Sequence, residues 1–284
     1  MPKDAPGRAE AGPEQAEKAR TFLDLHTPGE PLLLPNPWDQ GSARLLEAAG
    51  FAALATTSGG FATSLGRLDG AVSREEAITH AASIVASVRV PVSADLENCF
   101  ADDPGGVAET VAAAVAAGLA GCSVEDHKPG SDDPIYDPGL ARDRVQAACE
   151  VAHRGQVRMV ITARAENFLR GRENLDDTIK RLQAFQEAGA DVLYAPGLTR
   201  IEDIRAVVSS VDRPVNVLAI TGVPPVKDLA AAGVARVSVG SGFANVAWGS
   251  LLRAAEELRI AGTYGWRELA DEGSRAVRST FSRG

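Results

Sequence analysis

Cysteine is scarce in this sequence, and long apolar runs are absent. The 284 residues include three cysteines, Cys99, Cys122 and Cys149, and no CxxC pair. An odd and sparse set of this kind argues against a disulfide framework or a zinc site and is typical of a reducing compartment. No apolar run reaches the ~18 residues that a membrane-spanning helix needs. We therefore expect a cytoplasmic protein without membrane segments.

Positive charge is also in short supply. Lys and Arg number 29 against 38 Asp and Glu, which gives a net charge of −9. This balance lacks the basic footprint with which proteins bind nucleic acid or an anionic membrane, so neither partner is expected. The start of the chain has no apolar core of the signal-peptide kind, and residues 1–13 are expected to form a flexible tail.

What the sequence does have is a regular alternation of short β-type runs with helical segments. Eight such units begin near residues 32, 52, 91, 121, 157, 191, 214 and 236. Several helical segments end in Gly, the residue that best tolerates a left-handed C-terminal cap. Strands alternating with helices form a parallel sheet, and eight units predict a closed (β/α)8 barrel of the TIM type. A doubly wound open sheet is the alternative, but no GxGxxG motif follows the first strand.

Two further helices are expected outside the eight units. Residues from about 14 to 26 predict a helix before the barrel, and residues from about 265 to 280 predict a helical extension after it. Residues 14–284 are therefore expected to form a single α/β barrel domain.

Polar side chains stand at the predicted carboxyl ends of the strands, where barrel enzymes have their active sites. The stretch "VSADLE" reads as a strand in which Asp95 and Glu97 share one face, because successive strand side chains point to opposite faces. The other candidates at strand ends are Asn36, Trp38, Thr56 to Gly60, Glu125, Asp126, Thr162, Arg164, Glu166 and Asn216, with Asp69 in the loop after the second strand.

Four of these residues, Asp69, Asp95, Glu97 and Glu125, are acids that converge on one mouth. Like charges at close range repel and raise each other's pKa, so a cation is expected among them. Oxygen ligands without a His or Cys cluster indicate a hard metal, Mg²⁺ or Mn²⁺. Because Mg²⁺ usually keeps several waters, one carboxylate is expected to bind it directly while the others hold those waters. The alternative is that these acids cap helices or face solvent.

With those residues in hand, the chain resembles the isocitrate lyase and phosphoenolpyruvate mutase superfamily. The similarity covers roughly Pro31 to Arg259 and rests on "LLLPNPWDQGSARLLEAAGF", "TTSGGFATSLGRLDG", "PVSADLE", "VEDH", "ITARAE" and "GADVLYAPG", in that order. The resemblance implies an α/β barrel that binds Mg²⁺ together with an α-keto or 2-hydroxy carboxylate. It also implies that a bond next to that group is made or broken.

The resemblance assigns roles to individual residues. It implies that Asp95 is the direct metal ligand, that Glu97 takes the second position of a D-x-D pair, and that Glu125 and Asp69 hold metal-bound waters. It further implies that Ser58, Gly59 and Gly60 form the backbone turn for the substrate carboxylate, that Arg164 binds the substrate, and that Asn216 is the polar residue of the seventh strand. Trp38 either walls the substrate pocket or is a packed aromatic residue.

The loop after the fourth strand departs from the superfamily pattern. Isocitrate and methylisocitrate lyases carry a Lys-Lys/Arg-Cys-Gly-His segment there, whose Cys serves as acid or base. Here the loop reads "HKPGSDDPIYDPG", residues 127–139, and has no Cys. The sequence therefore supports neither of those two lyases, and the pattern of the mutase and hydrolase members is absent as well. His127 is a candidate acid or base, or a solvated side chain.

The expected activity is Mg²⁺-dependent cleavage of a C–C bond, by retro-aldol reaction or decarboxylation, through a metal-stabilised enolate. P–C bond chemistry, as in a mutase or phosphonopyruvate hydrolase, is the alternative. A protein that binds a keto acid without turnover is the third possibility. The resemblance also implies a homo-oligomer, a tetramer in which the last barrel helix is exchanged between neighbouring subunits.

Overall fold

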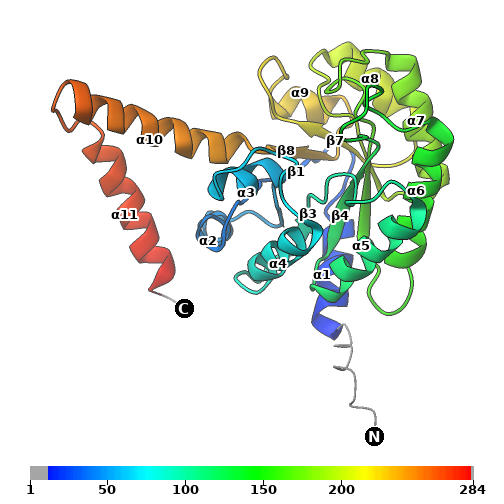
Figure 1. The fold of residues 1–284 in the computed structure, drawn as a ribbon, viewed down its shortest axis with the longest axis horizontal. Helices are drawn as coiled ribbons and strands as arrows, with labels where there is room; N and C mark the ends of the chain where they lie inside the picture. Colours follow the sequence, from blue (N-terminus) through cyan, green and yellow to red (C-terminus); the bar gives the residue numbers. More distant parts are fainter. Residues whose placement is uncertain (1–11, 283–284) are drawn as a thin grey trace, which may run out of the picture.

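Eight parallel strands organise residues 12–282, which are the residues that the computed structural model describes (Figure 1). In chain order the strands are β1 (Leu32–Leu34), β2 (Leu54–Ala55), β3 (Val92–Ala94), β4 (Gly121–Glu125), β5 (Val160–Arg164), β6 (Val192–Tyr194), β7 (Val215–Leu218) and β8 (Arg236–Ser238). Their order in the sheet is β1-β8-β7-β6-β5-β4-β3-β2. The amide of Ala55 also donates to the carbonyl oxygen of Pro35 at 3.1 Å, which links β2 to the end of β1. The predicted (β/α)8 barrel is confirmed.

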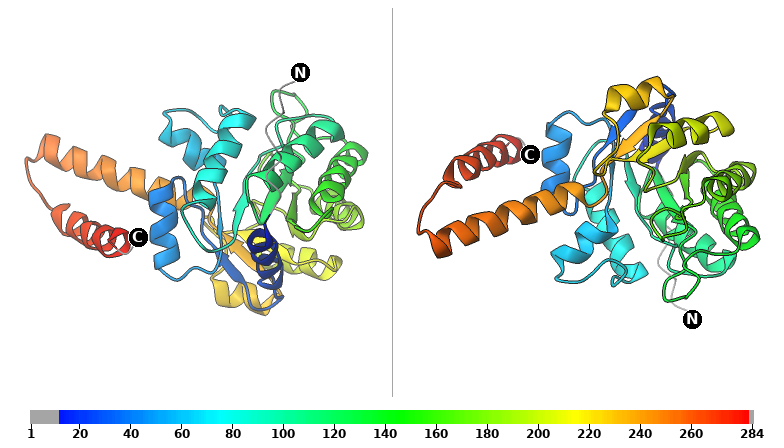
Figure 2. Two further views of the ribbon diagram at one scale, coloured as in Figure 1. Left: turned by 90° about the horizontal axis from the view of Figure 1, so that it is seen from below. Right: turned by 90° about the horizontal axis from the view of Figure 1, so that it is seen from above.

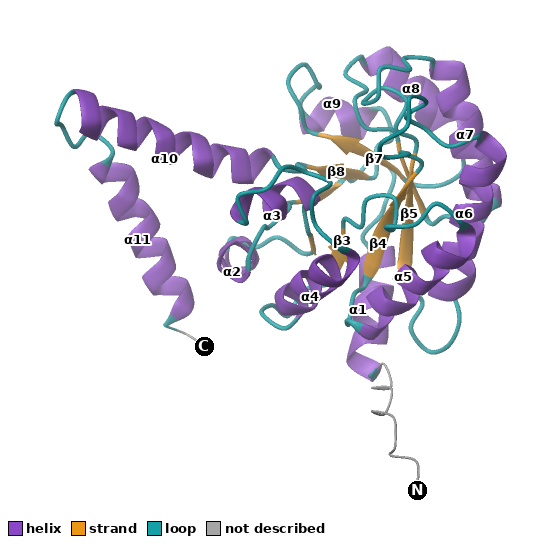
Figure 3. Cartoon of the chain, in the orientation of Figure 1, coloured by secondary structure: helices purple, strands orange, loops and turns teal. Residues whose placement is uncertain are grey.

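Helices surround this barrel, apart from the last two, which project away from it, and each strand is followed by at least one helix (Figure 3). They are α1 (Pro13–Asp24), α2 (Gln40–Ala48), α3 (Ser58–Ser64), α4 (Arg74–Val85), α5 (Pro104–Ala116), α6 (Pro138–Ala152), α7 (Leu175–Glu187), α8 (Ile201–Ser210), α9 (Val226–Ala231), α10 (Gly242–Ile260) and α11 (Arg267–Phe281). The additional helices expected before and after the barrel correspond to α1 and α11. Residues 1–11 of the predicted tail lie outside the described residues, and Pro13 already belongs to α1.

The strands are apolar because both of their faces are covered. All five residues of β4 are buried, one face by the barrel interior and the other by the helix layer. Helix α1 closes the end of the barrel at which the strands begin. There the ring of Phe22 lies so close to Gly121 that a Cβ at this position would come within 2.8 Å of it. The polar residues lie at the opposite end of the barrel, at the carboxyl ends of the strands.

The third strand differs from the sequence prediction. β3 ends at Ala94, and Glu97 has a φ of 51° in the loop that follows. The expected extended alternation, with Asp95 and Glu97 on one strand face, was therefore wrong. The two carboxylates still lie close together, because the loop turns back toward the barrel mouth.

Helix α10 leaves the barrel instead of packing along it (Figures 1 and 2). Only Ala244 of this helix is buried, whereas Val246, Leu252 and Ile260 are 66%, 70% and 65% exposed. Helix α11 folds back, and the guanidinium of Arg44 in α2 lies over the ring of Phe281 near the end of α11. Within residues 12–282, none of the helices has the length and apolar character needed to cross a membrane.

Candidate active site

Arg164, the last residue of β5, is the centre of the charged cluster at the barrel mouth. Its Nη1 lies 2.8 Å from Oε1 of Glu125 and 3.2 Å from Oδ1 of Asp95. Its Nη2 and Nε both lie 2.9 Å from Oε1 of Glu166. One buried guanidinium thus binds three carboxylates that come from the ends of β3, β4 and β5.

Asp95 is held in place by hydrogen bonds from two neighbouring strand ends. Its Oδ2 accepts from the hydroxyl of Ser58 at 3.0 Å and from the Ser58 amide at 3.3 Å. Its Oδ1 accepts from the hydroxyl of Ser123 at 3.2 Å, and its own amide donates to Oγ1 of Thr56 at 2.9 Å. The carboxylate that was expected to bind metal directly is therefore fixed before any ligand arrives.

Glu97 carries the charge that the arginines leave uncompensated. Burial, followed by the negative charges of Asp95 and Asp69, raises its pKa to about 7. Arg164 and Arg170 oppose this shift but are too distant to form an ion pair with it. Asp95 and Asp69 thus act on Glu97, and Asp95 acts on Glu125 as well, so the four acids expected to converge are linked electrostatically.

Glu125 and its neighbour Asp126 face different partners. Burial raises the pKa of Glu125 well above its usual range, although Arg164 opposes the shift. Burial also raises the pKa of Asp126 to about 6, and its carboxylate binds Arg181 of α7 at 3.0 Å and accepts from the Glu166 amide at 2.8 Å. Asp126 thus anchors α7 to the barrel through Arg181, while Glu125 lies at the barrel mouth and pairs with Arg164.

The Ser58 to Gly60 segment is the first turn of α3 rather than an open turn. Thr57 caps this helix, and its Oγ1 accepts from the Gly60 amide at 3.2 Å. Gly59 has no room for a side chain, because a Cβ would lie 2.7 Å from Oγ of Ser241 and 3.3 Å from the carboxylate of Asp69. The structure therefore brings this segment and Asp69 together, with the Ser58 amide already bound to Asp95.

Asn216 lies inside the barrel, and both ends of its amide group are hydrogen-bonded. It is 1% exposed, its Nδ2 donates to Oγ of Ser238 at 2.9 Å, and its Oδ1 accepts from Nε of Arg236 at 2.9 Å. Arg236 in turn donates to Oγ1 of Thr162 at 3.0 Å, and its Nη1 lies 3.1 Å from Nε2 of His26. This predicted substrate-binding residue is thus part of a buried polar chain that runs from the barrel interior to His26, which follows α1.

His127 and Trp38 stand at the edge of the cluster. Nδ1 of His127 lies 2.8 Å from the carbonyl oxygen of Pro134, which only accepts, so Nδ1 carries the proton and Nε2 is the basic nitrogen. Partial burial lowers the pKa of His127.

The ring of Trp38 lies 6.2 Å from that of Trp248 in α10, and its carbonyl oxygen is 2.9 Å from Nε2 of His80. Trp38 therefore borders the root of α10.

Arg170 is a second guanidinium at the mouth that the sequence analysis did not single out. Its Nε lies 3.4 Å from Oε2 of Glu166, and its Nη2 lies 3.8 Å from Oε2 of Glu125. The side chain is 34% exposed, so it faces incoming molecules. The spacing of four residues from Glu166 was the available signal, since such pairs meet when the backbone turns helically.

The acids at the mouth fit a divalent cation that is held largely through water. Within the described residues, no three His, Cys, Asp or Glu side chains are gathered closely enough to ligate one ion together. The donors are oxygens only, and burial together with the negative charges of Asp95 and Asp69 raises the pKa of Glu97. A hard cation that is bound directly by Asp95, with the other acids holding its waters, suits both observations.

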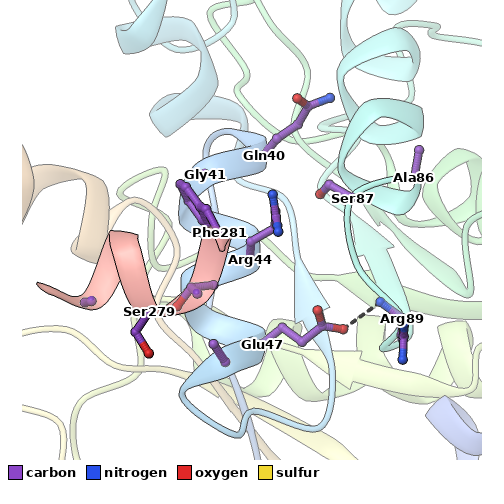
Figure 4. A pocket seen from close by; sticks show the side chains of 12 residues that line it. Gln40, Gly41, Arg44, Glu47, Ala86, Ser87, Arg89, Ser279 and Phe281 are labelled. Carbon is purple, nitrogen blue, oxygen red and sulfur yellow. Dashed lines mark hydrogen bonds between the residues drawn. The ribbon is translucent and has the colours of Figure 1, made fainter. Parts of the chain in front are cut away.

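A larger cavity lies elsewhere, on the flank of the barrel (Figure 4). It measures about 1,070 Å³ and lies between α2, the end of α4 and α11. Arg44 and Phe281 line it together, with Cζ of Arg44 4.7 Å from the centroid of the Phe281 ring, and Oε1 of Glu47 accepts from the Arg89 amide at 2.6 Å. None of the predicted site residues lines this cavity, so it is separate from the barrel mouth.

A parallel (β/α)8 barrel with acids and arginines gathered at the carboxyl ends of its strands defines a barrel enzyme architecture. The family model described as phosphoenolpyruvate phosphomutase matches residues 22–259. The chain therefore belongs to this family, within the isocitrate lyase/phosphoenolpyruvate mutase superfamily.

Relatives and solved structures agree with this assignment. An uncharacterized protein of Mycobacterium tuberculosis (strain H37Rv) is 34% identical, over 78% of this chain and 82% of its own length. The 2-methylisocitrate lyase of Escherichia coli (strain K12) is 29% identical, over 68% of this chain and 70% of its own. A crystal structure from Burkholderia cenocepacia J2315, provisionally described as a lyase/mutase, is 48% identical. It superimposes with a TM-score of 0.88 over 90% of this chain and 93% of that one.

Proposed function

We propose that this protein is a Mg²⁺-dependent enzyme that cleaves a C–C bond in a small α-keto or 2-hydroxy carboxylate. The observation that carries the proposal is the convergence of Asp95, Glu97 and Glu125 around Arg164 at the barrel mouth. This cluster offers binding groups for a hard cation and for an anionic substrate in one place. A Mg²⁺ ion, or Mn²⁺ in its stead, would supply positive charge to the oxygen that becomes negative as the bond breaks.

The residues divide this work between metal and substrate. Asp95 is the proposed direct ligand, with Glu97, Glu125 and Asp69 oriented toward the waters of the ion. Arg164 holds Asp95, Glu125 and Glu166 with four of its five N–H groups and offers the remaining Nη2 hydrogen, with its positive charge, to the substrate carboxylate. Arg170 stands beside it and provides a second positive group for a substrate with two anionic ends.

The loop after β4 limits which bonds are cleaved quickly. It lacks the Cys that serves as acid or base in isocitrate and methylisocitrate lyases, and a general acid or base contributes about 10²–10⁴-fold. Decarboxylation needs less from this loop, because charge stabilisation alone helps CO₂ to leave. We therefore expect oxaloacetate decarboxylation to exceed cleavage of isocitrate or 2-methylisocitrate.

A substrate screen tests the proposal directly. Oxaloacetate, 2-methylisocitrate, dimethylmalate and phosphonopyruvate are each incubated with the protein in Mg²⁺ and in EDTA, and the release of pyruvate or phosphate is followed. Mg²⁺-dependent turnover of one of the C–C substrates, lost in EDTA, is the expected result. Full activity in EDTA contradicts the metal requirement. Binding without turnover of any substrate indicates instead a keto-acid binding protein.

The second candidate is P–C bond chemistry, and one observation favours it. The family model that matches residues 22–259 is that of a phosphomutase. Charge stabilisation of an enolate serves P–C and C–C cleavage alike, so the cluster around Arg164 suits both. Turnover of phosphonopyruvate, in the absence of turnover of the C–C substrates, would decide for this candidate.

We further propose a cytoplasmic homotetramer in which α10 packs against a neighbouring subunit. The departure of α10 from its own barrel and its exposed apolar side chains support this arrangement. The three cysteines are free and buried, which agrees with a reducing compartment. Analytical ultracentrifugation at micromolar concentration tests the assembly, and a stable monomer would contradict it.

A further inference from the structure

The loop that follows β3 has an unusual backbone. Glu97, Cys99 and Phe100 all have positive φ angles, of 51°, 59° and 55°. Residues with a Cβ rarely adopt this conformation, because the Cβ crowds the neighbouring carbonyl oxygen. Such a loop persists only where the surrounding structure holds it. Since Glu97 belongs to the loop, the groups that hold the loop also place this carboxylate at the mouth.

Arg144 of α6 provides many of the contacts that hold the loop after β3 in this conformation. Its side chain is completely buried, and its guanidinium donates to the carbonyl oxygens of Asn98 at 2.6 Å and Asp102 at 2.8 Å. It also donates to the carbonyl oxygen of Ala101. A buried positive charge is thus directed at three backbone carbonyl groups of one loop, immediately after Glu97.

Tyr136 completes the same clamp from the neighbouring loop. Its ring lies under the Arg144 guanidinium, with Cζ 4.1 Å from the ring centroid. Its hydroxyl donates to Oδ1 of Asp102 at 2.5 Å and accepts from Nδ2 of Asn98 at 3.0 Å. Because Tyr136 stands near the end of the loop after β4, one buried hydroxyl joins that loop to the loop after β3.

We propose that Tyr136 and Arg144 are positioning residues that hold Glu97 at the barrel mouth. The inference rests on the proposed function, because that function needs the carboxylate beside Asp95. Loss of the Tyr136 hydroxyl leaves groups of Asn98 and Asp102 without their partner, and residues 96–102 then populate other conformations. The affinity for a divalent cation falls with the fraction of molecules that keep Glu97 in place.

The test uses Tyr136→Phe, which keeps the ring under Arg144 and removes only the hydroxyl. Hydrogen–deuterium exchange of residues 96–102 and Mn²⁺ binding by titration calorimetry are both measured well below the unfolding temperature. We expect faster exchange in this segment and Mn²⁺ binding weaker by about tenfold or more. Arg144→Lys, which keeps the charge and loses the fork, is expected to show the same pair of changes.

His153→Ala is the matched control. It removes the 2.9 Å contact with Asp191 at the opposite end of the barrel, so it lowers stability but leaves both measurements unchanged. Unchanged exchange in Tyr136→Phe, or faster exchange with unchanged Mn²⁺ affinity, overturns the inference. A wild-type protein that binds no Mn²⁺ counts against the proposed function, and the exchange of residues 96–102 then decides alone whether the clamp holds Glu97.

Discussion

Nη1 of Arg164 lies 2.8 Å from Oε1 of Glu125, and this contact ties the end of β5 to the end of β4. The same guanidinium also forms ion pairs with Asp95 and Glu166, so one arginine contacts three acidic side chains. Arg170 adds a second, more distant positive charge. Acids therefore outnumber arginines at the mouth, and burial, followed by the negative charges of Asp95 and Asp69, raises the pKa of Glu97 to about 7.

Removing the proposed direct ligand, Asp95, tests whether the acids at the mouth bind a cation. In Asp95→Ala we expect Mg²⁺ binding to be lost and kcat/KM to fall on the order of 10³-fold, because a bound metal contributes several kcal/mol and each ~1.4 kcal/mol is a factor of ten. Thermal unfolding should change little, since the residue stands at the rim. Asp133→Ala, at an exposed carboxylate paired with Arg172, is the control and should keep full activity.

Arg164 and Arg170 are expected to respond differently to the same substitution. In Arg164→Lys the charge remains, but one ammonium cannot reach Asp95, Glu125 and the substrate together, so kcat/KM should fall by about 100-fold. In Arg170→Lys the loss should stay below about tenfold, because this side chain makes only long contacts. Steady-state kinetics on the two variants decides, and losses of equal size would contradict the central position of Arg164.

Cation affinity should depend on pH through Glu97. Its raised pKa means that a proton occupies the carboxylate below about pH 7 and competes with the cation. Mn²⁺ affinity, measured by calorimetry at pH 6, 7 and 8, is therefore expected to rise with pH and to level off above 7. Glu97→Gln should bind more weakly and lose this part of the pH dependence. Identical pH profiles for the two proteins would show that another group titrates.

Stability should depend on pH through His26. Burial, followed by the charge of Arg236, lowers its pKa to about 3, so the folded protein keeps the ring neutral while the unfolded chain protonates it below about pH 6.5. Its stabilising contribution is therefore present above pH 6.5 and is lost as the pH falls toward 3. We expect the free energy of unfolding of wild type relative to His26→Gln to drop by about 2 kcal/mol between pH 7.5 and pH 5. Urea unfolding at both pH values measures it, and a constant difference would contradict the assignment.

His127 is expected to contribute modestly. Its Nδ1 is tied to Pro134, and only Nε2 remains as a base. In His127→Ala we expect oxaloacetate decarboxylation to fall by less than about tenfold, whereas an essential acid or base would cost ~10²–10⁴-fold. Initial rates on oxaloacetate measure this, with Lys128→Ala as the neighbouring control. A loss of 100-fold or more would make His127 the acid or base of the site.

The barrel itself could be predicted from the sequence because its strands are buried on both faces. Short apolar runs such as "GCSVE", separated by helical patterns that end in Gly, leave few other folds. Arg164 and Asp95 could be placed for the same reason, since Arg164 ends one buried strand and Asp95 directly follows another. Their meeting at the mouth follows from the parallel direction of the strands.

The loop after β3 could not be predicted in the same way. Neither Glu97 nor Phe100 belongs to a residue type that favours positive φ, so the sequence reads as a continuing strand. The conformation is imposed by Arg144, 46 residues away from Asn98 in the chain. The hydrogen bonds of Asn216 could not be predicted either, because its partner Arg236 also contacts His26, 210 residues away in the chain.

That last connection has a consequence for how the chain folds. His26 and Leu32 near the start meet Arg236 of the final strand, and Asn36 accepts from the amides of Val239 and Gly240. Contacts so distant along the chain form slowly, because a long loop must close before they form. During synthesis, β1 therefore waits for almost the entire barrel to emerge before it pairs with β8, whereas α1 finds its partners earlier, at Gly121 and β5. Until then the apolar surface of β1 stays open, and this early segment is where a chaperone would be needed most.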